Sequence, residues 1–358
     1  MAFTATKREW SELCAFFQLL YRGSVPAGNA AGQPGTELPI AYVQREEHEG
    51  TRRYYIEDNE IHIKGENIDR HFLREDFGTV ADLILEALKS NGEEVESPDG
   101  VEEFLDELAI FNLEAKTEDR TDLHIAFYSK QMPPIGFRIY SRIGGMNPLL
   151  DGGRAANIKF EQKNIRFPSP TINKINSLET DNTVLDRILM IERLGGELKF
   201  NDAADKIFRS NLHMIDLHFP RLIGEMVRVM YYDNVTKISE LTDIIKEQNP
   251  LKIKDELIRK HGYYEHKIKE FLLAISTGMR PAKLYNGKES AIGGILIMNA
   301  DGQMLCYSKM DRQTFGDFLL LNTRLEKGNM QKDHYGSLER ENNLFYFKLN
   351  LKVGLLKR

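Results

Sequence analysis

The sequence predicts a mixed α+β fold, in which a central mixed sheet is flanked by helices and followed by a helical and β C-terminal region. Three observations predict it. Strand-like segments fill much of the chain up to residue 168, helical periodicity dominates after it, and strands return from Ala291. A chain of 358 residues, 41% of them hydrophobic, is long enough for one large domain or two modest ones.

The part of the chain up to residue 168 begins with a helix and continues mainly as strands. Apolar residues recur at three- and four-residue spacing over residues 7–23, which predicts an amphipathic helix. Residues 24–35 are rich in Gly and Pro, which predicts a loop. The other elements expected here are strands over 40–46, 52–58, 60–65, 121–127, 136–141 and 155–162, and helices over 79–90 and 100–111.

Beyond residue 168 the pattern becomes mainly helical before the strands return. Residues 169–176 are polar, and we expect a loop there. The elements expected after it are helices over 182–196, 222–232, 237–250, 254–278 and 312–321, and strands over 292–299, 302–309 and 334–353.

Composition narrows the class of protein. The net charge of −6 argues against an indiscriminate nucleic-acid binder, although a cleft can still be basic locally. No run of about 18 apolar residues is present, so no membrane span is expected. The two cysteines, Cys14 and Cys306, make neither a disulfide framework nor a zinc site, and a cytoplasmic location is the expectation.

One pair of expected strands carries a pattern that suits phosphodiester hydrolysis. Asp122 begins the first strand, and its carboxylate can bind Mg²⁺, a cation that prefers oxygen ligands. On the next strand Arg138, Tyr140 and Arg142 share one face, because side chains repeat every two residues. A helix-borne carboxylate such as Glu12 could complete the metal site. Metal-dependent nucleases combine such an acid with a nearby cation.

Each of these residues also has an interpretation without chemistry. An Asp at the start of a strand is often a turn residue. Arg138 and Arg142 could simply form a solvated strand face, and so could Lys159 on the following strand. Spacing alone leaves both interpretations open.

Four segments, taken in order, resemble the HpaII-type restriction endonuclease family. They are "REWSELCAFFQLL", "TDLHIAF" with "GFRIYSRIGGMNPLLDGGRAANIKFE", "AISTGMRPAKLYNGKESAIGGILIMNADGQMLCY" and "NLFYFKLNLKV". The resemblance implies a type II restriction enzyme with a PD-(D/E)xK nuclease core, which cuts DNA at a short specific site with Mg²⁺. The change of pattern along the chain places that core over residues 1–168, and a region for DNA contact and dimerisation over 169–358.

The resemblance also assigns roles to single residues. Asp122 matches the metal-binding acid of the family, and Glu12 matches a glutamate of the first helix near the active site. The segment "GFRIYSRIG" is similar to the family pattern "GFSIKSxLG". Arg138 therefore stands where that pattern has Ser, and Tyr140 stands where it has the catalytic Lys.

Tyr140 leaves three alternatives open, because a tyrosine cannot present a positive charge at neutral pH. In the first, Arg138, Arg142 or Lys159 supplies the cation. A guanidinium can stabilise phosphate charge, but it does not lose its proton and so cannot activate water. In the second, the protein binds DNA and metal without cutting. In the third, the chain is a mutated or divergent copy with a different role.

The expected partners follow from the nuclease interpretation. They are double-stranded DNA with a short, palindromic site, a second copy of the chain that matches this symmetry, and a cognate DNA methyltransferase. Basic residues of the second region are the candidates for phosphate contacts, while a solvated helix face remains the alternative for the helical ones. The candidate DNA-binding residues are Lys252, Lys254, Arg259, Lys260, Arg280, Lys283, Lys288 and Arg154.

Overall fold

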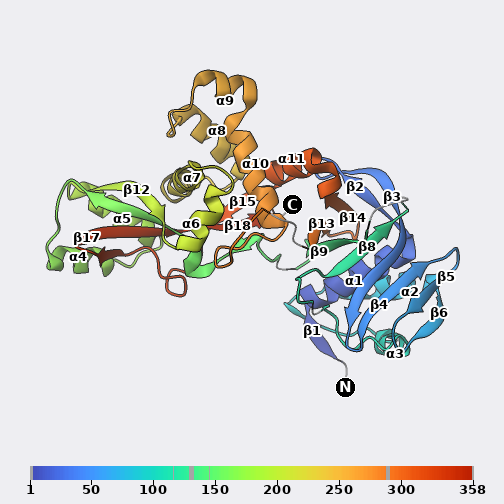
Figure 1. Ribbon diagram of the computed structural model, residues 1–358. Helices are drawn as coiled ribbons and strands as arrows, with labels where there is room; N and C mark the ends of the chain where they lie inside the picture. Colours follow the sequence, from blue (N-terminus) through green and yellow to red (C-terminus); the bar gives the residue numbers. More distant parts are fainter. Residues whose placement is uncertain (1–2, 116, 129–132, 145, 288–290, 357–358) are drawn as a thin grey trace.

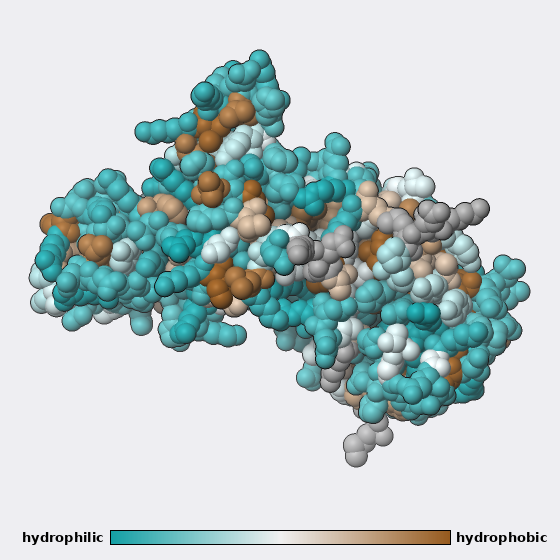
Figure 2. All heavy atoms as spheres, viewed as in Figure 1, coloured by the Kyte–Doolittle hydropathy of each residue, from teal (hydrophilic) through white to brown (hydrophobic). Residues whose placement is uncertain are grey.

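The computed structural model describes residues 3–115, 117–128, 133–144, 146–287 and 291–356. Figure 1 shows an elongated molecule, with a large sheet and its helices at one end and smaller sheets at the other. The predicted mixed α+β class is confirmed. Figure 2 shows a surface that is hydrophilic over most of the visible face, with scattered apolar patches, as is normal for a folded domain.

A nine-stranded mixed sheet forms the first lobe. In spatial order its strands are β2 (Ser24–Gly28), β14 (Met304–Ser308), β13 (Ile292–Met298), β9 (Ile135–Ser141), β8 (Leu123–Phe127), β3 (Pro34–Glu47), β4 (Gly50–Ile56), β5 (Glu60–Lys64) and β6 (Asp69–Leu73). β13 runs parallel to β9 and β14 runs parallel to β2, while the other neighbours in this order are antiparallel. The division at residue 168 stays a prediction, and this sheet contains strands from both sides of it.

The predicted N-terminal helix is confirmed as α1 (Lys7–Arg22). It begins with a capping box, in which the Thr6 hydroxyl accepts from the Glu9 N–H and the Glu9 carboxylate accepts from the Thr6 N–H. It ends at Gly23, whose left-handed backbone (φ 64°) suits glycine. The apolar face of α1 is buried in the core of the first lobe, which sets the direction in which its polar residues point.

The remaining elements of the first lobe cover this sheet or its margins. They are α2 (Arg74–Leu88), α3 (Val101–Glu107), α11 (Arg312–Asn322), the short helix η2 (Lys309–Asp311), and the ribbon of β1 (Thr4–Thr6) with β7 (Glu94–Glu96).

The second lobe contains two small sheets and most of the helices. One sheet has the order β12 (Glu197–Ala203), β11 (Asn157–Lys163), β17 (Leu344–Asn350), β16 (Leu338–Glu341), and the other β10 (Leu150–Asp151), β18 (Lys352–Leu355), β15 (Thr323–Glu326). The helices are η1 (Gly153–Ala156), α4 (Ser169–Asn176), α5 (Thr183–Arg193), α6 (Lys206–His213), α7 (Phe219–Asp233), α8 (Ile238–Gln248), α9 (Asp255–His261) and α10 (Tyr263–Ser276). α8 and α9 project from the body of the molecule (Figure 1).

Three predicted segments were wrong in detail. The loop expected over 24–35 contains β2 and the start of β3. β2 pairs with both β14 and β3, and this pairing outweighs the loop propensity of the local Gly and Pro residues. The loop expected over 169–176 is helix α4, in which Pro170 occupies the first turn, where proline is tolerated. The single helix expected over 254–278 is broken at Gly262, whose φ of 57° lies outside the helical region.

The third of the expected neighbouring strands lies in a different sheet. β11 follows β9 in sequence, but it pairs with β12 and β17 in the second lobe. The place beside β9 is taken by β13, which is fully buried because its alternate side chains enter two different hydrophobic cores. No helix in the described part of the chain is long and apolar enough to cross a membrane.

Candidate active site

The structure brings Asp122 and Glu12 together at one cavity between α1 and the β8–β9 strand pair. Asp122 directly precedes β8, and its N–H donates to the Phe137 carbonyl at 2.8 Å. The Asp122 Oδ2 atom accepts from the Ile139 N–H at 2.7 Å. Glu12, only 7% exposed, accepts from the Ala115 N–H at 2.9 Å through Oε1. Both carboxylates are therefore held by backbone donors.

The environment of this pair favours a bound cation. Burial raises the pKa of Asp122 to about 6. Burial, followed by the negative charge of Asp122, raises the pKa of Glu12 to about 8. At neutral pH the pair therefore retains a proton unless a cation offsets the repulsion. Because the donors are carboxylate oxygens, the pair fits a hard cation such as Mg²⁺.

Four arginines surround the approach to the pair. An open cleft of about 710 Å³ adjoins Asp122. Among the described residues that line it, the cationic side chains are those of Arg8, Arg120, Arg138 and Arg280. Burial, followed by the charge of Arg138, lowers the pKa of Arg280. Such a concentration of guanidinium groups suits a polyanion, because each guanidinium can bind phosphate oxygens through two parallel N–H donors.

Tyr140, where the family resemblance predicts a catalytic lysine, is only 2% exposed and belongs to a hydrophobic core. Burial raises its pKa, so the phenol stays neutral. The guanidinium carbon of Arg138 lies 5.4 Å from the centre of the Tyr140 ring, within the range of a cation–π contact. Arg138 is therefore a cation beside Asp122, two residues before the position at which the resemblance predicts a lysine.

Two other predicted cations are placed differently. The Lys159 Nζ atom lies 2.8 Å from Glu341 in the second lobe and 4.3 Å from the centre of the Tyr346 ring. The structure does not bring it to the cleft. Arg142 follows β9, is half-buried, and donates its N–H to the Met298 carbonyl at 2.9 Å. Neither residue lines the cavity or the cleft beside Asp122.

The candidate DNA-binding residues are scattered over the second lobe. Arg280 lines the cleft beside Asp122, whereas Arg154 lines a separate hollow with Glu339 and Lys348. Lys283 is exposed after α10, and Lys288 lies outside the described residues. Lys252 and Lys254 precede α9, on which Arg259 and Lys260 are highly exposed and pair with acids one turn earlier. The contacts of these residues with DNA stay predictions.

Sequence reasoning missed Arg8, Arg120 and Glu114. Arg8 precedes Glu12 by four residues on α1, a spacing that places both side chains on the same helix face. That spacing was a signal that could have found it. Arg8 is held by Glu114, with 2.8 Å between Nη2 and Oε1. Arg120 and Glu114 lie in an irregular segment with no periodic pattern, so local sequence offered no signal for them.

Comparison with known proteins identifies the family of this chain. The model of the HpaII restriction endonuclease family matches residues 6–355. The chain is 30% identical over 361 residues to the type II restriction enzyme HpaII of Haemophilus parainfluenzae, with 99% of each chain covered. No solved structure matches the chain significantly. Since the match covers both lobes and the resemblance expected from the four segments is confirmed, this chain belongs to the HpaII restriction endonuclease family.

Proposed function

We propose that this protein is a Mg²⁺-dependent type II restriction endonuclease, which hydrolyses phosphodiester bonds of double-stranded DNA at a specific site. The observation that carries the proposal is the buried pair of Glu12 and Asp122 beside a cleft lined with arginines. The type II restriction enzyme HpaII, which is 30% identical, supports the class of reaction.

Asp122 and Glu12 are the residues that would hold the metal. Bound Mg²⁺ would activate water and stabilise negative charge on the phosphoryl oxygens. The backbone donors of Ile139 and Ala115 fix the orientation of the two carboxylates. They also stabilise the ionised forms against the cost of burial, so that both acids can be charged once a cation is present.

The arginines would act by binding and by electrostatics. Arg138 and Arg8 both lie close enough to Asp122 to lower its pKa, against the larger effect of burial. Guanidinium groups at this place can hold the scissile phosphate and stabilise the charge that develops in the transition state. They cannot serve as general bases at neutral pH, because a guanidinium does not lose its proton. Water activation therefore rests on the metal site in this proposal.

The remaining parts of the proposal concern partners. A palindromic recognition site matches a homodimer, because the two-fold axis of the protein then coincides with that of the DNA. A cognate DNA methyltransferase would protect the host genome from cleavage.

A second candidate function is a DNA-binding member of the same family that does not cleave. Tyr140 favours it, because the residue at the position of the expected lysine is neutral and buried in an apolar core. The absence of a primary amine at that position removes a group that could orient or deprotonate water.

A cleavage assay on unmethylated phage DNA with Mg²⁺ tests both candidates. The protein is compared with Asp122→Ala and Tyr140→Lys, and DNA binding is measured in parallel by gel shift in Ca²⁺. Discrete fragments that are lost in Asp122→Ala support the nuclease. Binding without cleavage, with fragments from Tyr140→Lys, supports the second candidate. Neither binding nor cleavage in any of the three proteins would overturn both.

A further inference from the structure

Two histidines face each other on the edge hairpin of the large sheet, away from the candidate active site. His62 of β5 and His71 of β6 are direct cross-strand partners, so their side chains lie on the same face. Their rings stack with centroids 4.0 Å apart and planes inclined by 15°. β3 and β4 lie between this hairpin and β8, which Asp122 precedes. The cluster is thus separate from the acidic pair.

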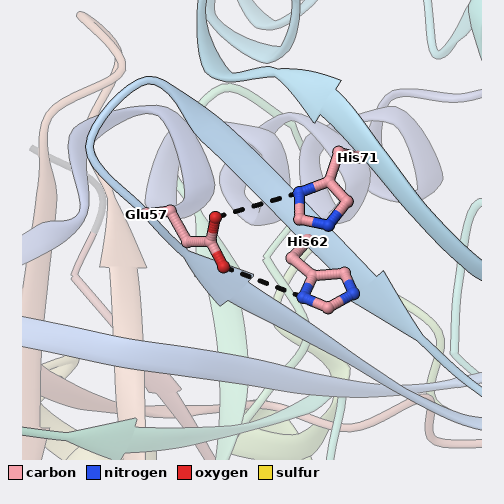
Figure 3. A group of neighbouring side chains, drawn as sticks. All are labelled: Glu57, His62 and His71. Carbon is pink, nitrogen blue, oxygen red and sulfur yellow. Dashed lines mark ion pairs between the residues drawn. The ribbon is translucent and has the colours of Figure 1, made fainter.

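A carboxylate from the neighbouring strand joins the two rings. Glu57 follows β4 directly, and its two oxygens point toward the two histidines (Figure 3). Oε1 lies 3.7 Å from His62 Nδ1, and Oε2 lies 3.8 Å from His71 Nδ1. One candidate ligand atom from each residue falls within 4.8 Å of the others. Strands β5 and β6 and the residue after β4 therefore bring three candidate donor groups close together.

These separations are close to those of a metal site. Metal–ligand bonds of about 2.0–2.2 Å in tetrahedral geometry place ligand atoms roughly 3.4 Å apart. Each Glu57 oxygen lies a few tenths of an ångström beyond that separation from its nearest histidine nitrogen. The three candidate ligand atoms lie within 4.8 Å of one another, so the largest approach that metal binding requires is about 1.4 Å. The stacked rings must also tilt, so that both Nδ1 lone pairs aim at one ion. Rotation about χ2 of histidine allows such a tilt at low cost, because that torsion has broad minima.

The neighbouring acids favour the required form of His62. Its Nε2 atom lies 2.6 Å from Asp69 Oδ1, a distance typical of a strong hydrogen bond. A proton on Nε2 leaves Nδ1 with a free lone pair toward Glu57, as in the carboxylate–histidine–metal arrangement. Glu60 Oε2 lies 3.1 Å from His71 Nδ1, so metal binding by that nitrogen requires Glu60 to move away or to become a ligand itself.

The alternative is a network of ion pairs and hydrogen bonds among the two histidines and the acids Glu57, Glu60 and Asp69, with no metal ion. Stoichiometric Zn²⁺ binding distinguishes the two arrangements.

We propose that Glu57, His62 and His71 form a binding site for a divalent first-row transition metal ion such as Zn²⁺. Two imidazole nitrogens and one carboxylate suit Zn²⁺, whereas Mg²⁺ prefers oxygen ligands alone. The exposed position of the cluster allows water to complete the coordination. A bound ion would link β4, β5 and β6 and stabilise the free edge of the sheet. This proposed metal site does not depend on the proposed nuclease activity.

Calorimetric titration of the full-length, untagged protein with ZnCl₂ tests this site. The protein is first treated with EDTA and then dialysed into millimolar Mg²⁺, which competes for the acidic pair. One Zn²⁺ should bind per chain. Binding should weaken at least about tenfold in His71→Gln, and about tenfold in Asp69→Asn, which removes the orienting carboxylate.

Matched variants separate this site from others. His213→Gln, which changes an exposed histidine of α6, and Asp122→Ala should both keep the affinity of the unchanged protein. Glu57→Gln provides a second change at the cluster, and circular dichroism checks that each variant is folded. Absence of stoichiometric Zn²⁺ binding would mean an ion-pair network only. Equal binding by the unchanged protein, His71→Gln and Glu57→Gln would also overturn the proposal.

Discussion

Replacement of Glu12 by Gln should stabilise the metal-free protein while it abolishes Mg²⁺-dependent cleavage. Glutamine has the shape of glutamate and keeps an oxygen that can accept from the Ala115 N–H, as Oε1 of Glu12 does. It cannot ionise, so it removes the cost of placing a carboxyl group at this buried position. It also removes one of the two charged oxygen donors that the proposed metal site requires.

The pKa of Glu12 sets the size of this effect. The pKa rises from an ordinary value of 4.5 in the unfolded chain to about 8 in the folded protein. As pH rises, Glu12 therefore loses its proton at a lower pH in the unfolded chain than in the folded protein. The free energy of unfolding falls as pH rises from about 4.5 to 8. At pH 7 the interval is about 2.5 pH units, each worth about 1.4 kcal/mol, so Glu12→Gln should increase the free energy of unfolding by about 3 to 4 kcal/mol. At pH 5 the gain should shrink to about 1 kcal/mol or less.

Urea unfolding in EDTA at pH 5 and pH 7 measures this difference. Glu103→Gln on α3 is the matched control, because Glu103 is exposed and should change stability by less than about 0.5 kcal/mol at either pH. A gain that is absent at pH 7, or equal at the two pH values, would refute the assignment of a raised pKa to Glu12. Retention of full cleavage by Glu12→Gln would refute its role as a metal ligand.

Three further predictions concern the cleft. Arg138→Ala should lower the initial rate of Mg²⁺-dependent cleavage by about 100-fold, whereas Lys159→Ala should leave that rate within about twofold. A larger loss in Lys159→Ala than in Arg138→Ala would contradict the role of Arg138 as the cation of the active site. The Mg²⁺ concentration for half-maximal cleavage should fall as pH rises from 6 to 8, because Mg²⁺ must displace the proton of Glu12. A concentration that does not change with pH would contradict this displacement. Arg120→Ala should lower the slope of log Kd against log salt for DNA binding by about 1, the contribution of one phosphate contact, measured by fluorescence anisotropy. Arg193→Ala, which changes an exposed arginine of α5, is the control and should keep the slope of the unchanged protein. Equal slopes for Arg120→Ala and the unchanged protein would mean that Arg120 does not contact the DNA.

An element could be predicted from local sequence where adjacent residues contain the whole pattern. The helix α1 was predictable because its apolar spacing and its Thr6–Glu9 capping box are both contained in adjacent residues. Asp122 at the start of a strand was visible for the same reason. Glu12 was a candidate partner of Asp122 as a helix-borne carboxylate and from the family resemblance, but nothing in the local pattern joins α1 to β8.

Local sequence could not predict which strands pair in a sheet. Lys159 lies on a strand that was predicted correctly, yet β11 joins the sheet of the second lobe, where Glu341 holds this lysine. Arg280 was expected to contact DNA from a loop, and the structure places it beside Arg138 in the cleft. Both outcomes depend on which surfaces are buried together, a property of the whole chain.

The sequence by itself determined the mixed α+β class, most of the helices and strands, and the absence of a lysine at position 140. Periodicity and capping are local, so they can be read from adjacent residues. Only the tertiary structure decided that β13 pairs with β9, that Tyr140 is buried, and that Arg138 stands beside Asp122. The physical reason is that burial of apolar strand faces selects partners far apart in sequence, and those partners determine which charges meet in the cleft.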